Sequence, residues 1–94
     1  MDDEKVIFRF HALNRMFQRR IRKQNVYRVL GTGETIEDYP KSHPFPSRLV
    51  LGCIDFRPLH VVVGFDERLG LTYIVTAYEP DPSEWEPGFR RRHV

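Results

Sequence analysis

The sequence predicts an α+β fold in which two short N-terminal helices pack on one face of a curved antiparallel sheet of about four strands, followed by a proline-rich C-terminal tail. Apolar residues recur at helical spacing within residues 12–30, and strand-like segments with short connections fill residues 35–78. Three prolines between residues 79 and 89 exclude further strand pairing. A chain of 94 residues is expected to form a single domain, residues 1–94.

The first helix is expected over residues 12–20, after a short strand or extended segment at residues 6–10. Four apolar residues at helical spacing form its inward stripe: Ala12, Leu13, Met16 and Phe17. On a neighbouring edge, His11, Arg15 and Arg19 follow one another at i, i+4 and i+8. They form a basic ridge with a histidine at its N-terminal end.

The second helix is expected over residues 24–30, with Val26, Val29 and Leu30 facing inward. Gly31-Thr32-Gly33 ends it, because glycine readily adopts the left-handed conformation found at helix C-termini. Helices this short are not stable alone, so the pair must pack on the sheet.

Four strands are predicted, over residues 35–39, 48–54, 57–65 and 71–78. A loop with three prolines, residues 40–46, separates the first two strands. The dipeptide Asp55-Phe56 and the segment 66–70 are the turns between the others. Such short connections favour an antiparallel meander.

The strand 57–65 carries His60 near its centre, and two explanations are open. The histidine is either satisfied inside the protein by a hydroxyl or carbonyl group, or it is a general acid or base on an exposed sheet face. If Phe65 pairs with Leu71 across the turn, His60 lies opposite Thr76 with Tyr78 beside it on the same face. These three residues form a candidate cluster.

The same counting across the Asp55-Phe56 turn sets Leu51 beside His60. The pairing that starts from Phe65 and Leu71 also sets Arg57 opposite Glu79 at the end of the sheet, where an ion pair is expected. The face opposite His60 is more uniformly apolar and is expected to carry the helices; it comprises Val50, Ile54, Leu59, Val61, Val63, Phe65, Val75 and Ala77. The His60 face then has three possible fates: burial by the tail with Trp85 and Phe89 as anchors, burial by a partner, or exposure as a shallow site.

Charge is unevenly distributed along the chain. Eight basic residues and no acidic residue lie between Lys5 and Gly33, although the net charge is only +2. This segregation favours a polyanion or an acidic protein as the partner, and two well-solvated helices are the alternative explanation.

Several classes of site are not expected. The four histidines lie in four different elements and the chain has one cysteine, so neither a metal nor another cofactor is predicted. Cys53 sits within a strand and is expected to be a buried, inert thiol. Because the chain starts without an apolar segment and has no run of membrane-spanning length, we expect a cytoplasmic protein with no membrane contact.

With metal, cofactor and cysteine sites set aside, the remaining class of reaction is cleavage of a phosphodiester without a metal. Cleaving RNA without a metal requires a base for the 2′-hydroxyl, an acid for the leaving oxygen and cationic donors for the phosphate. A histidine, a tyrosine and several arginines on one surface meet those needs.

Several short motifs are spread over nearly the whole chain: Phe10-His11-Ala12, the motif from Arg57 to Val62, the motif from Thr76 to Pro82, and Trp85-Glu86-Pro87. Together they resemble DUF 4258, a family of small bacterial and archaeal proteins of unknown function. That family looks related to RelE-like toxins and the wider barnase–colicin–RelE group of nucleases. The resemblance therefore implies a metal-independent ribonuclease toxin held by an antitoxin-like protein.

The leading hypothesis is an RNA-cleaving toxin that inhibits translation. His60 or His11 would be the general base or acid, and Tyr78 a second proton donor or phosphate ligand. The substrate-binding candidates are Arg15, Arg19, Arg57 and Thr76. The competing hypothesis is a non-catalytic module that binds RNA or protein, acting as a homodimer or as a small subunit of a complex.

Overall fold

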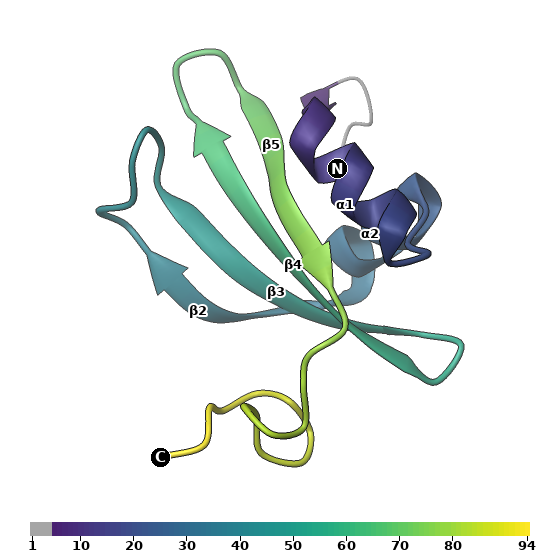
Figure 1. Cartoon of the computed structure of the whole chain (residues 1–94). Coiled ribbons are helices and arrows are strands. Elements are labelled where there is room, and N and C mark those ends of the chain that lie inside the picture. The colour runs from purple at the N-terminus through teal and green to yellow at the C-terminus, as the bar shows by residue number, and fades with distance from the viewer. Residues whose placement is uncertain (1–4) are drawn as a thin grey trace.

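The computed structural model describes residues 5–94 and confirms the α+β fold with two N-terminal helices (Figure 1). The elements are β1 (Val6–Phe8), α1 (Phe10–Gln18), α2 (Lys23–Thr32), β2 (Glu34–Tyr39), β3 (Ser47–Ile54), β4 (Arg57–Asp66) and β5 (Leu71–Tyr78). The strands form one sheet in the order β1-β5-β4-β3-β2. It has one strand more than predicted, because the extended segment before α1 pairs with β5 in parallel.

The two helices pack on different parts of the sheet. α2 lies on β3 and β4, and α1 lies along β5. Ala12 and Met16 of α1 are buried as predicted, but Phe17 is 84% exposed, so its predicted inward position is wrong. Because α1 rests on the sheet with its Ala12 side, Phe17 is turned toward the flank of the helix.

The register between β3 and β4 is the predicted one, with Ile54 opposite Arg57 and Leu51 opposite His60. Asp55 and Phe56 form the two-residue turn, and both have positive φ angles, 51° and 66°. Such angles are required by the turn type that best matches the twist of paired strands. The turn therefore forms even though neither residue is glycine.

The predicted register between β4 and β5 is wrong. Asp66, not Phe65, pairs with Leu71, and a bulge interrupts the pairing next to Val62 and Val63. The shorter turn and the bulge each move the register by one residue, so His60 pairs with Tyr78 instead of Thr76. Since the total shift is two residues, Tyr78 stays on the face of the sheet where it was expected.

The new register also changes the positions of two neighbouring residues of β5: the shorter turn sets Ile74 opposite Val63, and Val75 lies at the bulge, between the residues that pair with Val63 and Val62. Ile74 is completely buried, whereas Val75 is 53% exposed and does not join the apolar face as predicted. The extra residue in the strand reverses the alternation of side chains at that point. Six other predicted residues of the apolar face are buried: Val50, Ile54, Leu59, Val61, Val63 and Ala77. Phe65 is half-buried against them.

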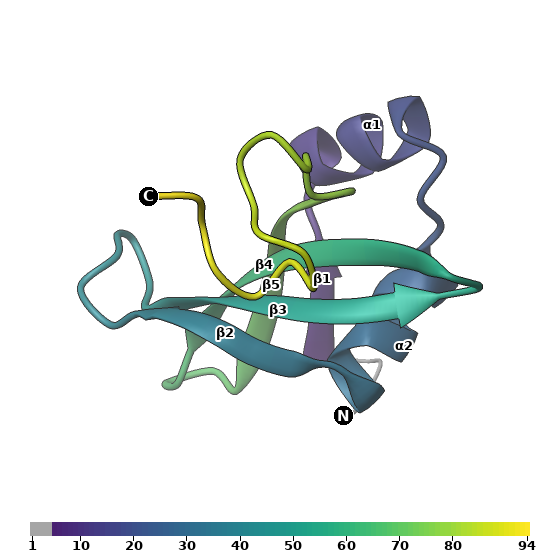
Figure 2. The same cartoon turned by 90° about the horizontal axis from the view of Figure 1, so that it is seen from below.

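The C-terminal tail, residues 80–94, folds back over the sheet on the side opposite α2 (Figure 2). Trp85 is 2% exposed and forms a bridge with Arg92, which closes the tail into a small loop. Of the three fates open to the His60 face, burial by the tail is the one observed. Cys53, expected to be buried, is exposed, because Gly52 and Ile54 on either side of it face α2 and the core, and the Cys53 side chain therefore points to the other face of the sheet.

No helix among residues 5–94 has the length and apolar character needed to cross a membrane.

Candidate functional site

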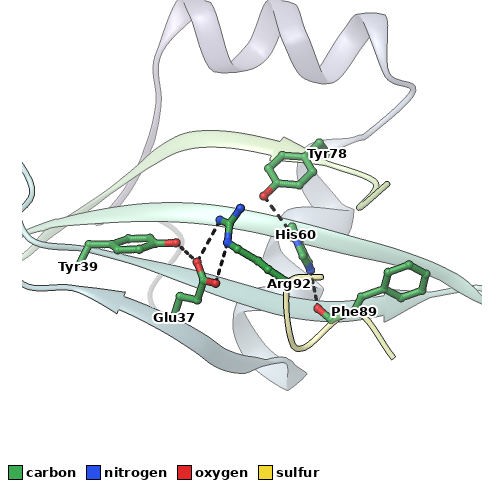
Figure 3. A network of polar contacts seen from close by, with 6 residues as sticks. All are labelled: Glu37, Tyr39, His60, Tyr78, Phe89 and Arg92. Atoms are coloured by element: carbon green, nitrogen blue, oxygen red, sulfur yellow. Dashed lines mark hydrogen bonds and ion pairs between the residues drawn. The ribbon is translucent and has the colours of Figure 1, made fainter. Parts of the chain in front are cut away.

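His60 is fully buried beneath the tail, and both of its ring nitrogens have partners (Figure 3). Nε2 lies 2.9 Å from the carbonyl oxygen of Phe89, and Nδ1 lies 3.3 Å from the hydroxyl oxygen of Tyr78. The Trp85 ring stands edge-on to the imidazole, with 4.5 Å between the ring centroids. A substrate would reach His60 only after the tail had moved.

These partners determine the state of the imidazole. A carbonyl oxygen can only accept, so Nε2 carries the proton and donates it to Phe89. Nδ1 is then free to accept from the hydroxyl of Tyr78. Burial lowers the pKa of His60 below its ordinary value, since the charged form would lose its hydration. His60 is therefore neutral at pH 7. Burial also raises the pKa of the Tyr78 hydroxyl above its ordinary value.

A second polar cluster fastens the tail to β2. Arg92 donates from Nε and a terminal nitrogen to the two carboxylate oxygens of Glu37, at 3.0 and 3.1 Å. Tyr39 donates its hydroxyl to the same carboxylate. The hydrogen bonds from Arg92 hold the pKa of Glu37 below its ordinary value, and the guanidinium also lies 4.5 Å from the centre of the Trp85 ring.

Two of the predicted arginines, Arg19 and Arg57, are half-buried and bonded within the protein, and the third is exposed. Arg19 donates to the Thr76 hydroxyl at 3.2 Å and to the Ala77 carbonyl at 2.9 Å. Arg57 donates to the carbonyls of Arg19 and Arg20 and forms the predicted ion pair with Glu79. These bonds attach the C-terminal end of α1 to the sheet. Arg15 is exposed on α1.

Arg19, Arg57, Tyr78 and Glu79 line one open hollow of about 460 Å³. Five of the seven predicted site residues are thus brought together: His60, Tyr78, Thr76, Arg19 and Arg57. The other two, His11 and Arg15, lie on the exposed surface of α1. His11 belongs to a different hollow.

That hollow, which we call the α1 groove, has a volume of about 500 Å³ and lies between the start of α1, the open part of the sheet and the proline-rich loop. Its polar and aromatic lining consists of Arg9, His11, Tyr39, Ser42, His43, Phe45, Ser47 and Tyr73. Gly64 and Val62 of β4 form part of its floor. The small glycine beside Tyr73 leaves room for the groove.

Aromatic packing gives one wall of the α1 groove a defined shape. The rings of Phe45 and Tyr73 stack nearly parallel, with 5.2 Å between centroids. The guanidinium of Arg9 lies 4.5 Å from the centre of the Tyr73 ring. The groove therefore presents one arginine and two histidines beside a rigid aromatic wall.

Sequence reasoning missed His43, Tyr73 and Tyr39 as site residues. His43 lies in the loop 40–46, whose prolines predicted a rigid spacer but not the place where the loop would pack. A correct β4–β5 register would have set Tyr73 beside Gly64, but that register depended on the turn, in which Asp66 and not Phe65 pairs with Leu71. In the part of the chain from residue 5 onward, no group of three or more potential metal ligands lies together.

The fold and these two sites define a small α+β protein, with helices on one side of a curved sheet and, on the other, a C-terminal tail beside an open groove. Residues 8–79 match the family described as Domain of unknown function (DUF4258), and the chain belongs to that family. No curated protein and no solved structure matches the chain. The matched region contains every predicted site residue and ends before the tail.

Proposed function

We propose that this chain is a metal-independent endoribonuclease, a RelE-like toxin that inhibits translation by cleaving RNA in the cytoplasm and is held by an antitoxin-like partner. The observation that carries the proposal is the α1 groove, where His11 and His43 line one open hollow with Arg9 and two tyrosines. Two histidines in one open hollow provide the two groups, one acid and one base, that cleavage without a metal requires.

Each group in the α1 groove has a part in this reaction. One histidine removes the proton of the 2′-hydroxyl, which attacks the adjacent phosphorus and forms a 2′,3′-cyclic phosphate. The other histidine protonates the departing 5′-oxygen, so the proton balance closes within the pair. Arg9 stabilises the negative charge that builds on the phosphate. The tyrosines offer rings against which a base packs.

The basic ridge of α1 extends the proposed RNA path. Arg15 lies one helical turn beyond His11 and is exposed, and Arg19 lies a further turn along, at the hollow that also contains Arg57 and Tyr78. A strand of RNA that leaves the groove along this ridge meets cationic side chains in succession. His60 would take part in cleavage only in a state without the tail contacts.

The test is cleavage of a fluorescently labelled single-stranded RNA by the purified chain in the presence of a metal chelator. His11→Ala and His43→Ala should each lower the cleavage rate by about 100-fold or more, with little change in RNA affinity. His93→Ala, which alters a histidine outside the groove, should cleave normally. DNA of the same sequence should stay intact because it lacks the attacking hydroxyl.

Growth provides the second readout. Expression of the wild-type chain should arrest its bacterial host, and the His11→Ala/His43→Ala double variant should not. Full cleavage by that double variant would exclude the groove as the active site.

A non-catalytic role is the second candidate, either as an RNA-binding or protein-binding homodimer or as a small subunit of a complex. The contacts of His60, Arg19 and Arg57 favour this role, because their polar groups already bond to other parts of the protein and not to a substrate. RNA binding without cleavage in the same assay would support this role.

A further inference from the structure

α1 carries an exposed apolar stripe on the side turned away from the α1 groove. Phe10 is 79% exposed and Phe17 is 84% exposed, and the half-buried Leu13 lies between them. The three residues are spaced i, i+3 and i+7 along the helix, so they share one face over two turns. We call Phe10, Leu13 and Phe17 the α1 stripe.

A hollow of about 550 Å³ runs beside the stripe, between α1 and the start of α2. Its floor includes Met16 and Ile21, which are 2% and 4% exposed and belong to the hydrophobic core. The hollow therefore reaches the edge of the core, and its wall is mostly apolar. Two almost fully exposed phenylalanines beside such a hollow are typical of a surface that a partner covers.

The charges around the hollow indicate the kind of partner. Arg22 and Lys23 are exposed, and among residues 5–94 they are the only charged residues in its lining. Neither forms a salt bridge with any carboxylate of residues 5–94. No acidic residue occurs anywhere between Lys5 and Gly33. An acidic segment is thus complementary to this rim.

We propose that the α1 stripe and its hollow bind an amphipathic helix of another protein, with apolar residues at i, i+3 or i+4, and i+7 and with acidic residues beside them. The two turns spanned by the stripe match that spacing, which is the usual pattern of a helix bound in a groove. The proposal concerns a surface separate from the α1 groove and does not depend on RNA cleavage.

Two other occupants fit less well. A symmetric dimer through this face would bring the Arg22 and Lys23 rim of one copy close to the same rim of the other, and like charges would repel. RNA would need several cations along its backbone, whereas this hollow offers two and is otherwise aromatic, aliphatic and amide in character. Both alternatives have distinct outcomes in the experiment.

The experiment measures binding of the full chain to a labelled synthetic peptide helix with leucines at i, i+3, i+4 and i+7 and glutamates on its other positions. Fluorescence anisotropy gives the Kd. Phe17→Ser should weaken binding by about tenfold or more, and Lys23→Glu should weaken it by a smaller factor. Phe56→Ser is the matched control, because Phe56 is 99% exposed on the β3–β4 turn and should leave Kd unchanged.

Two further peptides test the pattern and the charge. A peptide of the same composition with its leucines out of helical register, and one with lysine in place of glutamate, should bind much more weakly than the first.

Four results would overturn the proposal. The first is no binding of the acidic peptide up to about 1 mM. The second is an equal loss of peptide affinity with Phe17→Ser and Phe56→Ser. The third is a concentration-dependent dimer of the wild-type chain that Phe17→Ser dissociates, since a second copy would then be the occupant. The fourth is competition with the peptide by single-stranded RNA whose affinity falls with Phe17→Ser.

Discussion

At the scale of single residues, His60 shows how the centre of a core strand accommodates an ionisable group. Its Nε2–H donates a hydrogen bond to the Phe89 carbonyl, its Nδ1 accepts from the Tyr78 hydroxyl, and the Trp85 ring packs against the imidazole. The two explanations open from the sequence were an internally satisfied histidine and an exposed acid or base. In this structure the internal partners are a carbonyl and a hydroxyl, as the first explanation required.

This environment predicts a pH effect on stability. The ordinary pKa of His60 is 6.5 and burial lowers it, so the unfolded chain takes up a proton at this residue that the folded chain does not. The free energy of unfolding should therefore fall as the pH drops from about 7.5 to about 5.5. His60→Gln, which cannot titrate, should lose less stability over this range.

Urea unfolding of both proteins at the two pH values tests this. The stability gap between wild type and His60→Gln should narrow at the lower pH. A gap that stays constant would mean that His60 takes up its proton equally well in the folded protein.

At the scale of elements, the C-terminal tail stands out because its attachment combines one buried aromatic ring with polar bonds. Trp85 supplies the apolar anchor, and Arg92 joins the tail to Glu37 of β2 (Figure 3). Arg90 adds an ion pair with Glu34 at the other end of β2. Since exposed ion pairs contribute little, a single substitution should loosen this element without unfolding the sheet.

Arg92→Ala should release the tail locally. The substitution removes two hydrogen bonds to Glu37 and the contact with the Trp85 ring, at a cost of about 1 kcal/mol. Trp85 is the only tryptophan, so acrylamide quenching of its fluorescence reports the change directly. Quenching should increase in Arg92→Ala and stay at the wild-type level in Arg91→Ala, whose side chain is 85% exposed.

The pH dependence of the Arg92–Glu37 contact provides an independent check. The pKa of Glu37 lies below its ordinary value of 4.5, so the Arg92 contact contributes above that pH and is lost as the pH falls further. Equal quenching of the wild type and Arg92→Ala at neutral pH would show that the tail is held by Trp85 alone.

At the scale of the whole molecule, the basic ridge of α1 and the exposed apolar stripe lie on different parts of the surface. The ridge of α1 leads from the α1 groove toward the hollow with Arg19 and Arg57, while the α1 stripe lies on the other flank of the same helix. One short helix thus separates the proposed RNA surface from the proposed protein surface. Substitutions on its two flanks should affect two different binding reactions.

The RNA surface predicts a salt dependence. Arg15→Ala removes one exposed cation from the ridge and should weaken binding of single-stranded RNA irrespective of sequence, lowering the slope of log Kd against log salt concentration by about 0.7. Arg68→Ala, an exposed arginine in the β4–β5 turn, is the control and should not change the slope. An equal change in both variants would indicate binding spread over the whole surface.

Prediction from sequence succeeded where neighbouring residues decide the structure. Helical spacing placed α1 and α2, and a two-residue turn set the β3–β4 register. It failed where packing intervened. The shorter turn and the bulge in β5 together placed Tyr78, not Thr76, opposite His60, and Val75 lies exposed at the bulge. Helical spacing predicts Phe17 as a core residue, but it lies exposed on a flank of α1.

The sequence by itself determined the α+β class, the two helices, the apolar face of the central strands and the basic character of α1, because periodicity and charge act through residues close along the chain. Only the tertiary structure decided that the tail covers His60 and that His43 and Tyr73 join His11 in the α1 groove. The reason is physical: these contacts join segments distant in sequence, and one bulge or one turn residue changes which of them meet.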